Sequence, residues 1–287
     1  MASFAPPRAD LATAEKWFES STTVDGPFRE LLEQYSHIPA DNVVRHVVDT
    51  RNRAWDVHPY PCLGQFRFLE LNLSQRGDLY QRLLHELTNK PGSRFLDIGC
   101  CLGQDLRKLI YDGAPPRSVA GAELNGAFID LGYDMFRDRT STAGQTVIVA
   151  ANILESPSSS PSSPLYPLVG KFTCIQLGML LHLFTWEEQI VAFQNTLLLL
   201  RGQPGDRIFG QATGHLDGTP TASVGSRATF KHSAASFARL VDAVQGATST
   251  RWRIVTAELD NGLSVFDGKR TWDDPRTRRL VFEIERE

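Results

Sequence analysis

The stretch RFLDIGCCLG, residues 94–103, has the form of a strand that turns directly into a helix. Its apolar start predicts a buried strand, and the leucines that follow the turn recur at helical spacing. Gly99 allows the backbone to turn sharply as it leaves the strand, and Gly103 allows the start of the helix to approach a ligand. Because the first N–H groups of a helix lack partners within it, this junction predicts a ligand site.

Downstream of this junction, short apolar strands alternate with helical segments. The expected strands are residues 118–124, 146–152, 172–178 and 206–212, and the expected helices are residues 126–138 and 186–201. This alternation implies parallel βαβ units and a doubly wound α/β sheet. The end of the chain differs, because a helix at about 233–244 precedes two strands, 252–259 and 278–285, that can pair as a terminal hairpin.

The region before residue 91 has a different pattern. Apolar residues at helical spacing occur near both of its ends, and the stretch between them, residues 51–71, is aromatic and interrupted by prolines. Such a stretch is too apolar for a linker. We therefore expect an N-terminal helical cap over residues 1–90 and a ligand-binding α/β domain over residues 91–287.

Composition limits the classes of partner. The 287 residues carry a net charge of -3, and 41% of them are hydrophobic, so the sequence predicts a globular core and no nucleic-acid partner. No apolar run approaches the roughly 20 residues of a membrane span, and the start lacks the pattern of a secretory signal. Four cysteines without zinc-site spacing favour a reducing compartment and no metal. We expect a cytoplasmic protein.

An acidic residue closes the second expected strand. Glu123 lies 26 positions after Asp97 (123 − 97) and precedes Leu124 and Asn125. A carboxylate at this place can accept both hydrogens of a ribose diol. Asp97, at the end of the first strand, can face a cationic ammonium group. The pattern predicts a nucleoside ligand with a positively charged end.

Two further elements follow the third and fourth strands. After the third strand, an amide and an apolar side chain can recognise the edge and cover the face of an adenine, and the fourth strand ends in another candidate pair. These candidates are Ala151, Asn152, Ile153, Gln176 and Leu177. A glycine-rich turn alone is weak evidence of a cofactor site. Four elements in order, each at the end of a predicted strand, favour such a site, and Cys101 in the first turn is part of it.

With these motifs the chain resembles the class I S-adenosylmethionine-dependent methyltransferases. It is more closely similar to fungal O-methyltransferases of secondary-metabolite biosynthesis, including carboxyl O-methyltransferases of meroterpenoid pathways, on residues 51–71, 94–115 and the HLFTW run at 182–186. The resemblance implies a Rossmann-like seven-stranded sheet with its last strand antiparallel, S-adenosylmethionine as cofactor, and a homodimer. The general family usually has glycine where Cys101 stands and Asp where Asn152 stands.

The resemblance also implies the reaction, O-methylation of a small hydrophobic polyketide- or terpenoid-derived carboxylic acid. A carboxylic acid is ionised at neutral pH and needs no base, whereas a phenol gains from a nearby His. His182 follows the fourth strand and is the candidate base; the alternative is that it only bonds a backbone carbonyl. Phenol O-methylation and N-methylation remain open.

The cap offers a candidate acceptor pocket. Arg51 can pair with a carboxylate, while Trp55, Tyr60 and Phe66 can line an apolar wall. The alternative is that these aromatic residues are simply the core of the cap.

Two other classes of function compete with a methyltransferase. An NAD(P)-dependent oxidoreductase would show G-x-G-x-x-G, but the glycine after Gly99 is Gly103, and no Tyr-x-x-x-Lys pair occurs. A methyltransferase-like binding protein without activity is the other alternative. The intact set of Asp97, Gly99, Gly103 and Glu123 argues against a decayed cofactor site.

Overall fold

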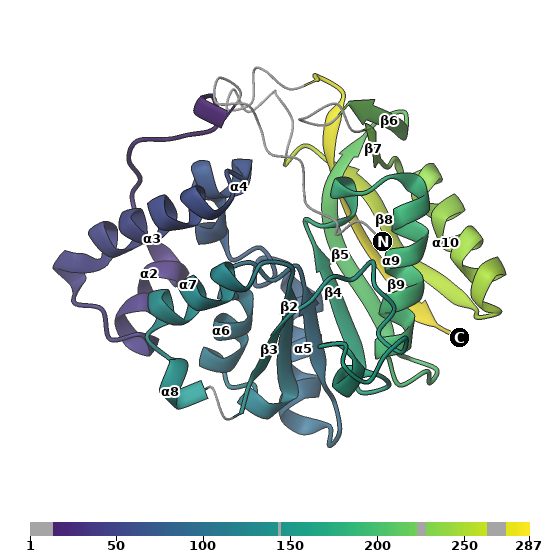
Figure 1. The fold of residues 1–287 in the computed structure, drawn as a ribbon, viewed down its shortest axis with the longest axis horizontal. Helices are drawn as coiled ribbons and strands as arrows, with labels where there is room; N and C mark the ends of the chain where they lie inside the picture. The colour runs from purple at the N-terminus through teal and green to yellow at the C-terminus, as the bar shows by residue number, and fades with distance from the viewer. Residues whose placement is uncertain (1–13, 143–144, 223–227, 263–273) are drawn as a thin grey trace. The chain divides into compact units, whose positions relative to one another are not determined.

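The computed structural model describes residues 14–142, 145–222, 228–262 and 274–287 (Figure 1). The described chain forms two compact units. One unit comprises residues 95–99 and 151–287, and we call it the C-terminal unit. The other comprises residues 14–94 and 100–150, and we call it the N-terminal unit.

In the C-terminal unit, three parallel strands continue into an antiparallel pair. β1 (Phe95–Ile98), β4 (Cys174–Gly178) and β5 (Arg207–His215) are parallel neighbours. The other elements of the unit are η5 (Tyr166–Leu168), η6 (Leu181–Leu183), α9 (Trp186–Leu199), β6 (Thr219–Ala222), β7 (Ala228–Lys231), α10 (Ala234–Thr248), β8 (Trp252–Asp260) and β9 (Thr277–Arg286). β9 is antiparallel to both β5 and β8, which confirms the predicted terminal hairpin. The small β6–β7 hairpin was not predicted.

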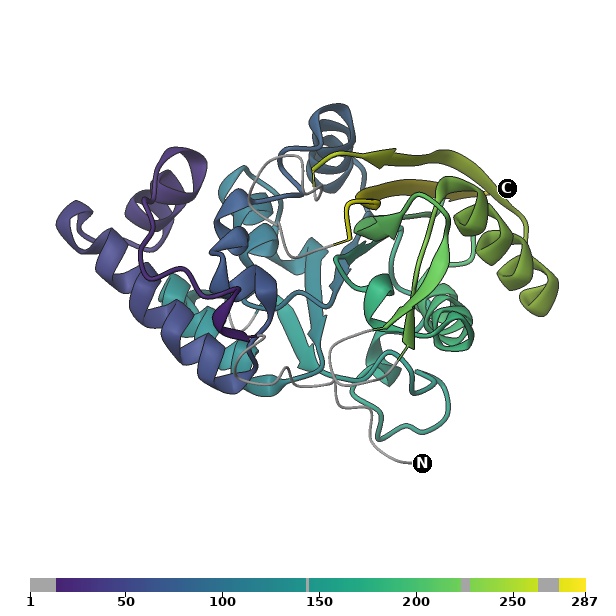
Figure 2. The same ribbon diagram turned by 90° about the horizontal axis from the view of Figure 1, so that it is seen from above.

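Local sequence explains where the two long helices of this unit begin. Thr185 and Glu188 form a reciprocal capping box at the start of α9, and Ser233 and Ser236 form another at the start of α10. Figure 1 and Figure 2 show α9 and α10 along the same face of the strands. Gly210 is required on β5, since a Cβ there would lie 2.2 Å from the carbonyl oxygen of Leu177 on β4.

The N-terminal unit combines the N-terminal helices with a parallel pair of strands, β2 (Val119–Glu123) and β3 (Val147–Ala150). Its helices and turns are α2 (Gly26–Glu30), η1 (Leu31–Tyr35), η2 (Ala40–Asn42), α3 (Val43–Val57), α4 (Pro61–Gly64), η3 (Arg67–Glu70), α5 (Gly77–Asn89), α6 (Gln104–Tyr111), η4 (Pro116–Ser118), α7 (Gly126–Phe136) and α8 (Arg139–Thr142). Figure 1 shows α3 beside α7. One apolar core joins Phe28 and Phe68 of the N-terminal helices to Phe128 and Phe136 of α7. The division of the chain at residue 90 stays a prediction.

Together the strands form a seven-stranded sheet of order β3-β2-β1-β4-β5-β9-β8. This order confirms the Rossmann-like α/β class, and the strand that ends the chain, β9, is antiparallel as expected.

A buried ion pair stabilises the N-terminal unit beneath the glycine-rich turn. The Arg107 guanidinium donates to both oxygens of Asp138, at 2.9 and 3.1 Å, and the Tyr35 hydroxyl donates to the same carboxylate at 2.9 Å. A Cβ at Gly103 would lie 2.3 Å from the Arg107 Nη1. Gly103 is therefore needed for this guanidinium as well as for its own left-handed backbone (φ +67°). Breaking such a buried pair costs about 3–5 kcal/mol.

A buried histidine joins three elements of the C-terminal unit. His232 Nε2 lies 2.6 Å from the Gln189 Oε1, and its Nδ1 lies 3.0 Å from the Ser236 hydroxyl. The Gln189 amide nitrogen donates to the carbonyls of Phe184 and Phe230, so it is the amide oxygen that faces the histidine. Because an amide oxygen can only accept, His232 carries its proton on Nε2. Burial, with a smaller contribution from Arg239, lowers the pKa of His232 to about 4.

We predict that acid destabilises the protein through this histidine. The unfolded chain binds a proton below the usual pKa of about 6.5, whereas the folded chain resists protonation until about pH 4. The free energy of unfolding is therefore unaffected by this histidine above pH 6.5. Below that pH it falls by about 1.4 kcal/mol for each unit of acidification, or by about 3 kcal/mol at pH 4. Urea unfolding between pH 4 and 7 measures this slope, which His232→Gln should flatten. An equal slope in the variant would contradict the assignment.

Candidate functional site

The turn between β1 and α6 contains three residues in the left-handed region. Gly99, Cys101 and Gly103 have φ of +79°, +51° and +67°. The Gly103 N–H donates to the Cys100 carbonyl at 2.7 Å, which closes the turn. The left-handed region is disfavoured for a residue with a Cβ, so the backbone explains why a glycine is usual at the position of Cys101.

The Glu123 carboxylate is held by the backbone of two loops. Its Oε2 accepts a hydrogen bond from the Cys101 N–H at 3.0 Å, and its Oε1 accepts one from the Asn125 N–H at 3.1 Å. The side chain is almost buried, and burial raises the pKa of Glu123 while these hydrogen bonds oppose that rise. Each carboxylate oxygen can accept a further hydrogen bond, and binding of a ribose diol at these positions stays a prediction. Sequence reasoning proposed the carboxylate but not its tie to Cys101.

The residues beside Glu123 begin α7. Asn125 is the N-cap, and its Oδ1 accepts from the Ala127 N–H at 3.0 Å. Leu124 connects the strand to this cap and is half-buried. The local sequence therefore fixes the position of Glu123 from both sides.

In the C-terminal unit, Asp97 and Gln176 are paired side chains. They are register partners on β1 and β4, and the Gln176 Nε2 donates to the Asp97 Oδ1 at 3.1 Å. Both residues are buried, and Leu177, the next residue of β4, is fully buried. The amide of Gln176 therefore orients the carboxylate of Asp97, a role that the sequence did not predict.

The loop after β3 is organised by its own side chains. The Asn152 Oδ1 accepts from the Leu154 N–H at 3.0 Å, and the Asn195 amide donates to the Ile153 carbonyl at 2.7 Å. Ile153 is buried and Ala151 is half-buried. Contacts of these residues with an adenine stay predictions.

The imidazole of His182 is oriented by β5. The Thr213 N–H donates to its Nδ1 at 3.3 Å, so the neutral ring carries its proton on Nε2. The Met179 N–H likewise donates to the Gln211 carbonyl at 2.6 Å, which ties the turn after β4 to the same strand. This tautomer donates a hydrogen bond through Nε2 and is not arranged to take a proton there.

Arg51 and Phe66 lie in the interior of the N-terminal unit. The Arg51 guanidinium lies 4.0 Å from the ring centroids of both Phe18 and Phe66. Its Nη1 donates to the carbonyls of Glu19 and Gly64, at 2.7 and 2.9 Å. Burial lowers the pKa of Arg51. These contacts give Arg51 a structural role, and its contact with substrate stays a prediction.

Trp55 and Tyr60 are only half-buried. The Trp55 ring packs edge-on against Phe18 with centroids 5.3 Å apart. The Tyr60 ring lies 5.9 Å from that of Phe128 at the start of α7. The structure thus separates the four predicted acceptor residues into a buried pair and a more accessible pair.

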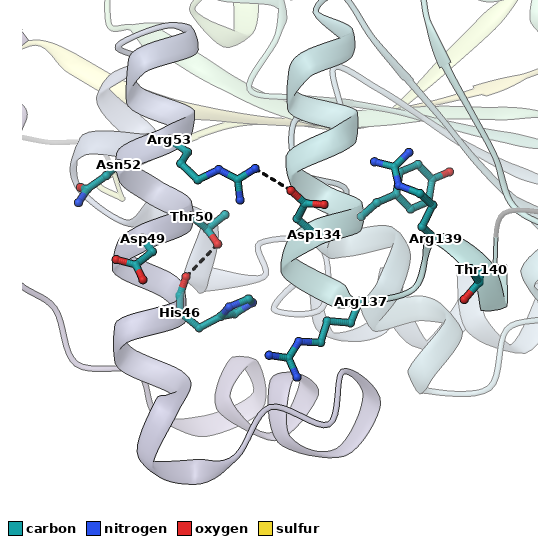
Figure 3. A pocket seen from close by; sticks show the side chains of 10 residues that line it. His46, Asp49, Thr50, Asn52, Arg53, Asp134, Arg137, Arg139 and Thr140 are labelled. Atoms are coloured by element: carbon teal, nitrogen blue, oxygen red, sulfur yellow. Dashed lines mark hydrogen bonds and ion pairs between the residues drawn. The ribbon is translucent and has the colours of Figure 1, made fainter.

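A surface pocket of about 940 Å³ lies between α3 and the C-terminal end of α7 (Figure 3). Figure 3 shows Arg53 and Asp134 pointing toward each other from the two helices, and they form an ion pair at 2.6 Å. The lining residues are His46, Asp49, Thr50, Asn52, Arg53, Tyr133, Asp134, Arg137, Arg139 and Thr140. Because Asn125 caps the other end of α7, this mixed-charge pocket is distinct from the loop that holds Glu123.

The described residues offer neither a metal site nor a membrane-spanning helix. Within that part of the chain, no group of three or more His, Cys, Asp or Glu side chains could hold a metal ion. Among the same residues, no helix is long and apolar enough to cross a membrane.

Known proteins resemble the chain in sequence and in fold. Residues 17–69 match the meroterpenoid methyltransferase N-terminal domain family. O-methyltransferase atr3 of Stereocaulon alpinum is 37% identical over 94% of this chain and 75% of that protein. The asnovolin E/chermesin D methyltransferase nvfJ of Aspergillus novofumigatus is 35% identical over 85% of each chain.

A solved structure shows the same fold at low identity. Geranyl diphosphate methyltransferase in complex with S-adenosylmethionine superposes with a TM-score of 0.51 at 13% identity, over 79% of this chain and 89% of that one. This likeness concerns the fold, and the sequence relatives establish the family. The chain belongs to the family of fungal methyltransferases that includes atr3 and nvfJ, and it is an enzyme with the fold of the S-adenosylmethionine-dependent methyltransferases.

Proposed function

We propose that the enzyme transfers a methyl group from S-adenosylmethionine to a carboxylate of a small hydrophobic secondary metabolite. The observation that carries this proposal is the Glu123 carboxylate, held by the N–H groups of Cys101 and Asn125. A buried carboxylate fixed by two backbone donors has acceptor positions left for a ribose diol. The donor would supply an activated sulfonium methyl group when bound.

The other predicted contacts complete the proposed donor site. Asp97, oriented by the Gln176 amide, would face the ammonium group of the methionine part. The remaining residues of the proposed donor-binding loops are Gly99, Gly103, Leu124, Asn125, Ala151, Asn152, Ile153 and Leu177. The chain would bind and orient the two reactants, and orientation alone can lower a barrier by about 7–11 kcal/mol in favourable cases.

The tautomer of His182 supports a carboxylate acceptor. A base is needed for a phenol but not for a carboxylic acid, which is ionised at neutral pH. With Nδ1 accepting from the Thr213 N–H, the neutral ring carries its proton on Nε2 and is not arranged to take another there. The acceptors named for relatives support a metabolite substrate, since nvfJ acts on asnovolin E or chermesin D.

The setting of the enzyme is also a proposal. Within the described part of the chain no disulfide joins the four cysteines, Cys62, Cys100, Cys101 and Cys174, which supports a reducing compartment such as the cytoplasm. A homodimer is the assembly that the family resemblance suggests. Sedimentation of the purified chain would test that assembly.

We predict that Glu123→Gln weakens binding of S-adenosylhomocysteine by about 10- to 100-fold. The reason is that the amide NH2 of glutamine replaces a carboxylate oxygen that would accept a charged hydrogen bond from the ribose. Isothermal titration calorimetry measures the dissociation constant. Glu187→Gln, on the exposed first turn of α9, is the matched control and should bind like wild type. Failure of the wild-type enzyme to bind S-adenosylhomocysteine would remove the proposed function.

We predict that His182→Gln keeps methyl transfer within about tenfold of wild type, because its amide retains one acceptor and one donor. The rate with a carboxylic acid should be flat between pH 6 and 8, since an acid of pKa about 4 is already ionised. Mass spectrometry with a labelled methyl group identifies the ester. A loss of about 10²- to 10⁴-fold, with a rate that rises with pH, would instead indicate a general base and a phenol acceptor.

A further inference from the structure

We propose that Tyr60 contacts the methyl donor, so that the N-terminal helices contribute directly to the donor site. This inference rests on the proposed function. It moves Tyr60 from the acceptor pocket, where the sequence placed it, to the sugar side of the donor next to Glu123.

The first observation is the position of the ring. Tyr60 is the N-cap of α4, and its ring lies 4.2 Å from that of His58 and 5.9 Å from that of Phe128. Phe128 belongs to the first turn of α7 and donates its N–H to the carbonyl of Asn125. Asn125 in turn donates to the Glu123 carboxylate. The segment that starts α4 therefore packs against the same helix end that positions Glu123.

The second observation is electrostatic. Burial raises the pKa of the Tyr60 hydroxyl, and the negative charge of Glu123 is the next largest cause of that rise. Burial also raises the pKa of the Cys62 thiol to about 11, and Glu123 contributes to this rise as well. Both side chains at the start of α4 thus lie within the field of Glu123. The phenol is neutral near pH 7 and can donate a hydrogen bond.

The third observation is the state of the hydroxyl. Within the described part of the chain, the Tyr60 hydroxyl makes no hydrogen bond, although the residue is half-buried. The hydroxyls of Tyr35 and Tyr111 donate to Asp138 and Glu30, at 2.9 and 2.8 Å. A partly buried tyrosine hydroxyl usually has a polar partner. A ribose hydroxyl that also donates to Glu123 has the chemistry and the location to be that partner.

The test separates donor binding from acceptor binding. Tyr60→Phe removes only the hydroxyl, and we expect the dissociation constant for S-adenosylhomocysteine to rise by about two- to tenfold, as for the loss of a neutral hydrogen bond. The KM for the acceptor, measured at saturating donor, should stay unchanged. Tyr166→Phe, at an exposed tyrosine of η5, is the control and should leave both constants unchanged.

Several results would overturn this inference. An unchanged dissociation constant with a raised acceptor KM would return Tyr60 to the acceptor pocket. A lower urea midpoint with both constants unchanged would show a purely structural role. If wild type binds S-adenosylhomocysteine and Tyr60→Phe binds it equally well, the inference fails while the proposed function stands. If wild type does not bind it, the proposed function itself fails.

Discussion

The bond between the Glu123 carboxylate and the backbone N–H of Cys101 is the interaction on which the rest of the site depends. It fixes the end of β2 to the turn before α6, two segments 22 residues apart. The turn needs three left-handed residues to present that N–H, which accounts for the glycines around it. Through Asn125 the same carboxylate is also tied to the start of α7. The glycine-rich motif, the left-handed turn and the proposed ribose contact therefore all involve the Glu123 side chain.

Buried polar contacts of the N-terminal unit surround this arrangement. The buried pair of Arg107 and Asp138 lies directly beneath the turn, and the Arg51 guanidinium joins the segment at Glu19 to α4 through backbone carbonyls. Both guanidinium groups have partners within the protein, so each has a structural role. Charged residues in a sequence can thus serve stability even where their pattern suggests binding, because burial with full hydrogen bonding satisfies them internally.

Local patterns were sufficient to predict the fold but not the contacts within the site. Strand ends, helix starts and the terminal hairpin follow from hydrophobic periodicity and from glycines, which act over a few residues. The orientation of His182 depends on an N–H of Thr213, 31 residues away, and the clash that requires Gly103 depends on Arg107 being held by Asp138. The packing of Tyr60 against Phe128 spans still more of the chain. Such contacts are set by tertiary packing, which a pattern along one sequence does not encode.

The central claim, that Glu123 binds the ribose diol of the donor, is tested most directly by a double-mutant cycle between enzyme and ligand. Calorimetry would compare S-adenosylhomocysteine with its 2′,3′-dideoxy analogue, in wild type and in Glu123→Gln. If Glu123 binds the diol, wild type should prefer the natural ligand by at least about tenfold, and the variant should lose most of that preference. An equal preference in both proteins would show that the diol is bound elsewhere and would contradict the account.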